Sequence, residues 1–290
     1  MPFTNSPLRY PGGKSQLSNY VKHILQINDI NGTYIEPFAG GFGVGLDLLF
    51  SEKVKRVVIN DLDPSIFAIW YAILNDTDDF VREIIETPIT INEWEKQRKI
   101  RVNYKNDPYS LKNAFSSFFL NRTNVSGIIN GGPIGGRNQT GKYKIDCRFN
   151  KKKIIEKIYK IKNYNKRIIL KNVNALDFIN LELPRYSVNN TFIFFDPPYY
   201  FQGKNLYLSS MDKNEHLNMA KSIISLDQYY WITTYDVSNY ILDLYYPHVQ
   251  AYKYSLNYSA NKKRKAEEYL FAANNLKLGS YGNVDLKRIN

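Results

Sequence analysis

The alternation of apolar strands and helices between residues 33 and 75 most constrains the fold of this chain. Residues 33–39 (TYIEPFA) predict a short strand that runs into a glycine-rich turn, and GVGLDLLF after it predicts a helix. Residues 54–60 (VKRVVIN) predict a second strand, and PSIFAIWYAILN predicts a helix with Pro64 in its first turn. A β-α-β-α opening is typical of a parallel, doubly wound sheet.

The pattern changes between residues 77 and 165, where the sequence predicts no strand. Thr90 and Glu93 have the spacing of a capping box ahead of a charged helix. Helices are predicted over residues 92–105, 109–122 and 150–163. A segment rich in Gly and Asn, NVSGIINGGPIGGRNQTGKY, separates the last two. We therefore expect residues 77–165 to form a mostly helical insertion.

Strand patterns return after residue 166. The segments that predict strands are RIILKN, TFIFF, QYYWITTY, HVQAYKYSLNY and EEYLFAAN, whereas ALDFIN and residues 212–225 predict helices. Residues 1–76 and 166–290 are therefore expected to form one domain. The predicted fold is α/β, with a doubly wound, mostly parallel, Rossmann-like sheet and an inserted helical domain.

Charge and composition narrow the classes of partner. The formal net charge is +12, which suits a polyanionic partner such as nucleic acid. Cys147 is the single cysteine, which excludes an intrachain disulfide and fits a reducing cytoplasm. The histidines lie far apart without ligand spacing, so no metal site is expected. No apolar run approaches about 20 residues, and we expect a cytoplasmic protein with no membrane partner.

The strongest chemical pattern is TFIFFDPPYY, residues 191–200. An apolar strand ends here at Asp196, and ligands bind at the carboxyl ends of strands in open α/β sheets. Pro197 and Pro198 remove two N–H donors and leave carbonyl oxygens that only accept hydrogen bonds. Asp196 is also acceptor-only when ionised. The segment predicts a site that accepts hydrogen bonds from an NH2 group beside the aromatic face of Tyr199.

The exocyclic amino group of adenine needs such a site, because its lone pair is delocalised into the purine ring. The Asp196 carboxylate and the Pro197 carbonyl would bind both N6 hydrogens and direct the nitrogen lone pair toward a methyl sulfonium. Tyr199 would stack on a base flipped out of the duplex. We predict catalytic roles for Asp196, Pro197, Pro198 and Tyr199, with a rigid proline turn as the purely structural alternative.

Two further segments predict a nucleoside site. IEPFAGGFGVG places Glu36 and Phe38 at a strand end, and glycines beginning at Gly40 permit a ligand to approach the backbone. The dinucleotide fingerprint is absent because Leu46 stands where its last glycine is required. Asp61 ends the next predicted strand, where a carboxylate can bind ribose hydroxyls; a helix N-cap is its alternative role.

RYPGGK, near the N-terminus, predicts a lid over that nucleoside. An aromatic face beside a sulfonium is favourable through cation–π attraction. We therefore expect Tyr10, with Lys14 after it, to cover a bound cofactor.

Taken in order, these segments resemble the Dam-like adenine-N6 DNA methyltransferases of the D12 class. The resemblance rests on RYPGGK, EPFAGG, NDLDP, FFLNRTNVSG, DFI, DPPY and NYSANKKRKAEEYLF. A cofactor loop first, a target-recognition insertion second and DPPY third is the α order of that class. The resemblance implies methyl transfer from S-adenosylmethionine to adenine N6 in double-stranded DNA, without a metal. It also implies a monomer, with a cognate restriction endonuclease as a partner of some members.

The resemblance also implies the roles of individual residues. The residues that would contact S-adenosylmethionine are Tyr10, Lys14, Glu36, Phe38, Gly40, Asp61, Asp177, Phe178 and Asp196. Asp177 and Phe178 would flank the adenine of the cofactor. In the insertion, Asn121, Arg122 and Ser126 would contact DNA.

The loop after the Asn-Arg pair departs from the members that methylate GATC. Those members carry a stretch resembling NGLxRxNxxGxFNVPFG, where this chain reads SGIINGGPIGGRNQTGKYKIDCRFNKKK. The departure does not favour GATC as the target. Arginine is the commonest reader of guanine, and the loop residues predicted to contact DNA are Arg137, Lys142, Tyr143 and Arg148. The alternative for each of these residues, taken singly, is a solvated side chain that does not contact DNA.

Other activities remain open at this stage. Cytosine-N4 methylation uses similar chemistry and is the nearest alternative, although the Asp form of the tetrapeptide and the α order favour adenine. Cytosine-C5 methylation needs a nucleophilic cysteine after a proline at a strand end, and Cys147 does not have that position. An inactive DNA-binding relative and an RNA methyltransferase are the remaining alternatives.

Overall fold

The computed structural model describes residues 4–10, 12–201, 211–258 and 264–289. One mixed sheet forms the centre, with strand order β3-β2-β1-β4-β5-β7-β6-β8. The strands are β1 (Thr33–Glu36), β2 (Arg56–Asn60), β3 (Ile168–Lys171), β4 (Thr191–Phe195), β5 (Tyr230–Asp236), β6 (Gln250–Tyr258), β7 (Arg264–Ala272) and β8 (Lys287–Arg288). In the NYSANKKRKAEEYLF motif, residues 259–263 lie outside the described part of the chain.

The first five strands are parallel neighbours, and β7 runs antiparallel between β5 and β6. Thr33 of β1 pairs with Arg56 of β2 on one side and with Thr191 of β4 on the other. This register brings the carboxyl ends of β1, β2 and β4 to one edge of the sheet. The predicted doubly wound, mostly parallel sheet is confirmed, and the reversed β7 is the part that the sequence did not predict.

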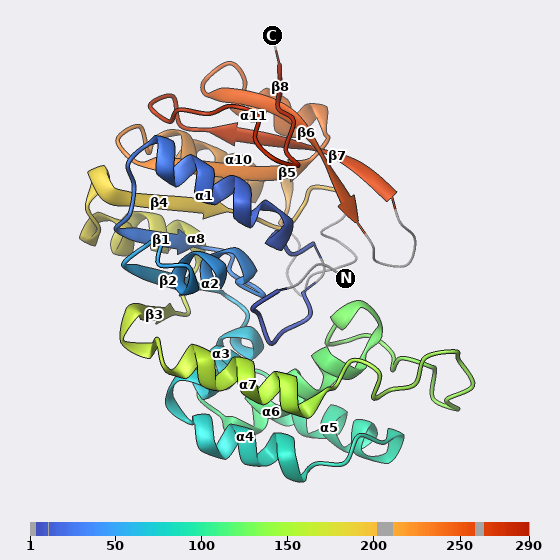
Figure 1. Cartoon of the computed structure of the whole chain (residues 1–290). Coiled ribbons are helices and arrows are strands. Elements are labelled where there is room, and N and C mark those ends of the chain that lie inside the picture. The colour runs from blue at the N-terminus through green and yellow to red at the C-terminus, as the bar shows by residue number, and fades with distance from the viewer. Residues whose placement is uncertain (1–3, 11, 202–210, 259–263, 290) are drawn as a thin grey trace.

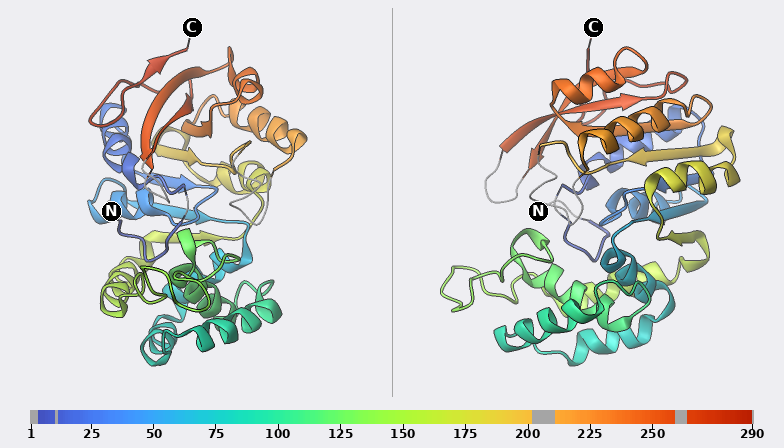
Figure 2. Two further views of the ribbon diagram at one scale, coloured as in Figure 1. Left: turned by 90° about the vertical axis from the view of Figure 1, so that its right-hand side faces the viewer. Right: turned by 180° about the vertical axis from the view of Figure 1, so that it is seen from behind.

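Helices cover both faces of the sheet (Figures 1 and 2). On one face lie α1 (Ser18–Ile27) and α2 (Gly43–Phe50); on the other lie α8 (Ala175–Asp177), α10 (Lys213–Ile224) and α11 (Asn239–Tyr245). Every residue of β1 and of β4 is buried. Strands covered on both faces have continuous apolar sequences, which is why TFIFF shows no alternation of polar and apolar residues.

The remaining long helices form the lower part of the molecule in Figure 1. They are α3 (Pro64–Asn75), α4 (Thr77–Glu86), α5 (Ile91–Tyr104), α6 (Leu111–Thr123) and α7 (Lys151–Lys162). Residues 77–165 contain no named strand, only an isolated bridge between Asn124 and Pro133. The helical character predicted for this stretch agrees with the structure, while its standing as a separate recognition domain stays a prediction.

The capping box predicted at the start of α5 is half formed. The Thr90 hydroxyl accepts the Glu93 backbone N–H at 3.2 Å. The Glu93 carboxylate accepts from Gln97 Nε2 at 2.7 Å, one turn further along the helix. Thr90 therefore caps the helix, and Glu93 stabilises its first turns as an i,i+4 partner.

Two lysines of α7 bind backbone carbonyls at the ends of other helices. Lys162 donates to the Leu74 carbonyl in the last turn of α3, and Lys151 donates to the carbonyls of Ile85 and Thr87 at the end of α4. These carbonyls lack partners within their own helices, and a cation stabilises the negative end of a helix dipole. Part of the basic composition thus stabilises the fold.

Across the described residues, no helix is long and apolar enough to cross a membrane.

Candidate active site

Asp196 follows β4 directly and meets residues from two distant parts of the chain. Lys14 Nζ lies 2.9 Å from its Oδ1 and 3.1 Å from its Oδ2. The Thr234 hydroxyl of β5 donates to Oδ1 at 2.8 Å. Lys14 is buried and also donates to the Gly12 carbonyl at 2.8 Å. The carboxylate therefore lies at the sheet edge with a buried ammonium against it.

Burial raises the pKa of the Asp196 carboxyl above its usual range. The charge and hydrogen bond of Lys14, and the hydroxyl of Thr234, oppose this rise because they stabilise the ionised form. The ionisation of Asp196 thus depends on Lys14 staying in place.

The loop after Asp196 is held by a second carboxylate, Asp236, at the end of β5. Its Oδ1 accepts the Tyr200 N–H at 3.0 Å, and its Oδ2 accepts the Phe201 N–H at 2.9 Å. Asp236 is 5% exposed, so both bonds lie in a protected environment. Sequence reasoning missed this residue, although a predicted strand rich in aromatic and β-branched residues runs directly into this Asp.

The Tyr199 ring is buried between aromatic and cationic neighbours. Its centroid lies 6.4 Å from that of Tyr235, and Lys14 Nζ lies 4.7 Å above its face. His216 packs edge-on to Tyr235 from α10 with a centroid separation of 5.7 Å. These contacts fix the ring that the sequence predicted to stack on a base.

Glu36 ends β1 and is buried. Its Oε1 accepts from the Tyr34 hydroxyl at 2.8 Å and from the Gly45 N–H at 3.3 Å. Burial raises the pKa of Glu36 to about 8, while the Tyr34 hydrogen bond works against the rise and the charge of Asp196 adds to it. Near neutral pH the carboxyl is therefore largely protonated and able to donate a hydrogen bond.

Asp61 bridges the ends of β1 and β2. Its Oδ2 accepts the Gly40 N–H at 2.8 Å, and its Oδ1 accepts the Asp63 N–H at 2.9 Å. The N-cap of α3 is Asp63, which accepts the Ser65 N–H at 2.8 Å, so Asp61 is not a helix cap. Burial, and then the charge of Asp63, raise the pKa of Asp61 to about 7.

Tyr10 lies on the glycine turn between β1 and α2. Gly40 has φ +46°, and a Cβ there would lie 2.5 Å from Tyr10 Cε1, so the ring requires a glycine beneath it. Phe38 is partly buried in the same turn and packs against the core. The structure thus brings Tyr10, Gly40 and Asp61 together, with the Tyr10 ring packed directly on Gly40, and their contact with a nucleoside stays a prediction.

Asp177 and Phe178 have opposite environments. Asp177 is exposed at the end of α8, whereas Phe178 is fully buried in the core. Phe178 shows no surface to a ligand here, because its ring is buried in the hydrophobic core. A direct contact of Phe178 with a nucleoside is not favoured by this placement, and the role of Asp177 stays a prediction.

The helical insertion places its predicted DNA residues in two environments. Asn121 is 1% exposed and bonds the Arg9 backbone, so its placement does not favour a direct DNA contact. The Arg122 guanidinium donates to the carbonyls of Pro7 and Arg148. Burial, reinforced by the charges of Arg9 and Arg148, lowers the pKa of Arg122 to about 9. Ser126 is partly exposed in a left-handed conformation with φ 57°.

The loop of residues 135–148 presents charged and aromatic side chains to solvent. Arg137 is 64% exposed, 3.5 Å from Glu95 Oε1, and its guanidinium lies over the Trp94 ring. Lys142 and Tyr143 are exposed next to each other, and Arg148 is partly buried where the loop rejoins the helices. Figure 1 shows this loop extending from the helical region. Arg137, Lys142 and Tyr143 are therefore accessible to a large polyanion.

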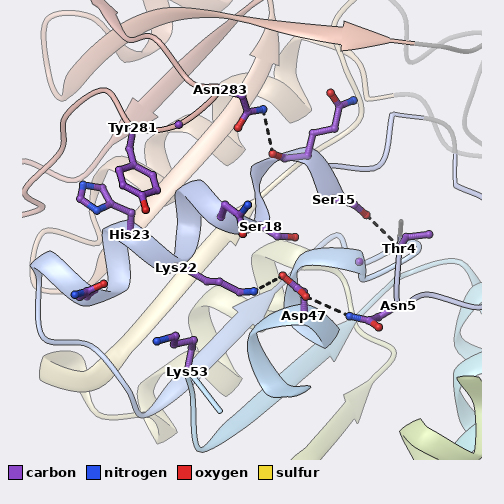
Figure 3. Close-up of a pocket in the computed structure, with 15 residues that line it drawn as sticks. Thr4, Asn5, Ser15, Ser18, Lys22, His23, Asp47, Lys53, Tyr281 and Asn283 are labelled. Atoms are coloured by element: carbon purple, nitrogen blue, oxygen red, sulfur yellow. Dashed lines mark hydrogen bonds and ion pairs between the residues drawn. The ribbon is translucent and has the colours of Figure 1, made fainter. Parts of the chain in front are cut away.

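A polar cavity of about 1060 Å³ lies elsewhere, between α1, α2 and the C-terminal segment (Figure 3). Lys22 pairs with Asp47 at 2.6 Å across it, and His23 stacks on Tyr281 with ring centroids 4.0 Å apart. None of the predicted site residues lines it.

In the part of the chain that the structure describes, no group of three or more His, Cys, Asp or Glu is placed to hold a metal ion.

Two curated relatives are similar over most of the chain. The type II methyltransferase M.MjaIII of Methanocaldococcus jannaschii is 27% identical over 241 residues, which cover 76% of this chain and 80% of the relative. The type II methyltransferase M.CviBI of Paramecium bursaria Chlorella virus NC1A is 26% identical over 223 residues, which cover 73% and 76%.

Solved structures with similarity to the chain include the rRNA methyltransferase AviRa of Streptomyces viridochromogenes, with TM-score 0.39, 11% identity and coverage of 91% of this chain and 86% of that one. A second is the putative RNA methyltransferase PH1948 of Pyrococcus horikoshii, with TM-score 0.38, 8% identity and coverage of 91% and 83%.

The family of D12 class N6 adenine-specific DNA methyltransferases matches residues 10–259, which include the glycine turn, the helical insertion and the loop after β4. The match confirms the family that the ordered motifs predicted. The chain belongs to the D12 class of N6 adenine-specific DNA methyltransferases.

Proposed function

We propose that the chain methylates adenine N6 in duplex DNA at the Asp196–Tyr199 loop, after the base is flipped from the helix. The observation that carries the proposal is the position of Asp196, an acceptor at the carboxyl end of a central strand beside a fixed aromatic ring. A base within a stacked duplex cannot reach such a site, so the target nucleotide must leave the stack.

The loop would bind the amino group through two acceptors. The Asp196 carboxylate and the Pro197 carbonyl would each take one N6 hydrogen. Both acceptors are held before the substrate arrives, because Thr234 fixes Asp196 and Asp236 fixes the backbone after Tyr199. Preorganised acceptors of this kind stabilise the charge that develops on nitrogen without a reorganisation cost during the reaction.

The residues at the ends of β1 and β2 fit S-adenosylmethionine, which supplies an electrophilic methyl group when bound. The Glu36 and Asp61 carboxyls offer hydrogen-bonding oxygens, and the Tyr10 ring packs on the turn at Gly40 and offers an aromatic face beside them. Tyr10, Phe38, Lys14 and Asp196 would complete the site, and the exposed carboxylate of Asp177 would flank the adenine of the cofactor.

The exposed residues of the 135–148 loop would contact the DNA. Arg137, Lys142 and Tyr143 are accessible, and each cation close to a phosphate releases counterions. The protein would act as a monomer in the cytoplasm. A cognate restriction endonuclease would be its partner in the cell.

Identification of the methylated nucleoside tests this proposal. Duplex DNA and RNA of matched sequence content are incubated with the protein and S-adenosylmethionine, then digested and separated by liquid chromatography with mass detection. We expect N6-methyladenosine in its deoxy form from the DNA. N4-methylcytosine alone, or methylation of the RNA alone, would overturn the proposal, and strand sequencing of the modified DNA then gives the target site.

A further inference from the structure

Asn121 lies inside the insertion rather than on its surface. It occupies the last turn of α6 and is 1% exposed. Its Oδ1 accepts the Arg9 N–H at 2.8 Å, while its Nδ2 donates to the carbonyls of Arg9 at 2.7 Å and Gly127 at 2.8 Å. The side-chain amide therefore binds the Arg9 backbone in both directions, as a neighbouring strand would.

Other contacts hold the same point of the chain. The Arg9 guanidinium donates to the Asn124 carbonyl at 2.7 Å and to the Arg122 carbonyl at 3.4 Å. Gly127 has φ +80°, and a Cβ there would lie 2.2 Å from the Arg9 carbonyl oxygen. The turn after α6 thus closes tightly on Arg9, and the tightness requires glycine.

The segment that begins at Arg9 leads directly to the proposed active site. Tyr10 is the next residue, and its ring covers Gly40. The Gly13 N–H donates to the Tyr10 carbonyl at 3.2 Å, and the next residue, Lys14, binds Asp196. Figures 1 and 2 show this N-terminal segment between the sheet and the helical insertion.

We infer that Asn121 is a positioning residue for methyl transfer: it fixes Arg9, and thereby holds Tyr10 on the glycine turn and Lys14 on Asp196. The inference rests on the proposed function of Asp196. It replaces the predicted DNA contact of Asn121 with an indirect role, because a buried amide with its N–H donors on two carbonyls has none to offer a phosphate or a base. The insertion is thereby connected to the catalytic carboxylate through a segment of six residues, from Arg9 to Lys14.

The test separates kcat from DNA affinity. Asn121→Asp keeps the shape of the side chain but sets a carboxylate oxygen against the carbonyls of Arg9 and Gly127. Gly127→Ala disturbs the same contacts with Arg9, because the added Cβ would meet the Arg9 carbonyl oxygen. A second variant keeps the test valid if the first fails to fold. Asn163→Asp, at the exposed end of α7, is the matched control.

For each variant that melts as wild type does, we expect kcat at saturating DNA and S-adenosylmethionine to fall about tenfold or more, since small misplacements of reacting groups cost about that much. The Kd for DNA should stay within about twofold of wild type. The acid limb of the kcat–pH profile should move to higher pH, because Lys14 would no longer oppose the effect of burial on Asp196; a general loss of folded protein would lower the amplitude without moving the limb.

A rise in DNA Kd with unchanged kcat would overturn the inference and restore Asn121 as a DNA contact. An unmoved acid limb would equally overturn it, because Lys14 would then be held on Asp196 without the contacts between Asn121 and Arg9. Failure of the proposed function itself looks different: the wild-type protein would form no N6-methyladenine under any condition.

Discussion

Lys14 Nζ lies 2.9 Å from Asp196 Oδ1 and 4.7 Å from the centre of the Tyr199 ring. One ammonium therefore contacts two of the groups that the proposal assigns to the target base, the Asp196 carboxylate and the Tyr199 ring. Such a cation stabilises the ionised carboxylate in a site where burial favours the neutral acid. An ionised carboxylate can accept several hydrogen bonds, so Asp196 can bind the adenine amino group while Lys14 keeps it ionised.

Removal of the Lys14 charge should shift the pH dependence of the reaction. Burial raises the pKa of Asp196 and Lys14 lowers it, so Lys14→Met leaves only the Thr234 hydroxyl to oppose the rise. A higher pKa means that the acceptor carboxylate is lost at higher pH. We expect the acid limb of kcat against pH to move upward in Lys14→Met and to remain near wild type in Lys14→Arg. A limb that stays in place in Lys14→Met would show that the ammonium does not control Asp196.

Asp236 should support catalysis without contacting the cofactor. Asp236→Asn leaves one acceptor oxygen where Tyr200 and Phe201 now have two, and sets an amide N–H against one of these donors. We expect kcat to fall about tenfold from misplacement of the loop, with the Kd for S-adenosylmethionine unchanged by calorimetry. Asp243→Asn, on the exposed side of α11, is the control and should behave as wild type. A normal kcat in Asp236→Asn would show that the two hydrogen bonds of Asp236 do not position the catalytic loop.

Glu36 should make the folded state less stable as pH rises. Its pKa is about 8 in the folded protein and near 4.5 in an unfolded chain, so unfolding releases its proton between these values. The free energy of unfolding then declines with pH by at most about 1.4 kcal/mol per unit for this group. Glu36→Gln stays neutral, so its stability should fall less between pH 5 and about pH 8 in urea titrations. Parallel curves for the two proteins would contradict the raised pKa.

Arg137 should contribute to DNA binding through its charge. Arg137→Ala removes an exposed cation from the loop, so the Kd for duplex DNA should rise, and the slope of log Kd against log salt should fall by about 1 if the contact is a phosphate. Arg82→Ala, on the exposed surface of α4, is the matched control. An unchanged Kd for Arg137→Ala at every salt concentration would show that Arg137 is solvated and does not contact the DNA.

The sequence predicted the elements whose causes are local. The helices at residues 43–50 and 64–75 have the predicted bounds, because an apolar run follows a glycine turn in one and Pro64 starts the other. The strand that ends at Asp196 was equally clear. The reversed β7 was not predicted, since the direction of a strand depends on its partner and not on its own residues.

Of the predicted site residues, the structure places Lys14, Asp196 and Tyr199 together, and their catalytic roles stay a prediction. The residues that support them were harder to predict. Asp61 could not be distinguished from a helix cap until the structure showed Asp63 in that role. Asp236 was missed because it acts on a loop 35 and 36 residues away in sequence. Asn121 was assigned to DNA because a polar residue in a recognition segment has no sequence mark that separates burial from exposure.

The central claim is that Asp196 accepts hydrogen bonds from the adenine amino group during methyl transfer. The most direct measurement is single-turnover methylation by Asp196→Ala with DNA and S-adenosylmethionine both saturating, alongside DNA binding by fluorescence anisotropy. The account predicts that methyl transfer is lost, by about a thousandfold or more, while DNA affinity is retained. Turnover near the wild-type rate would contradict it and place the chemistry elsewhere in the protein.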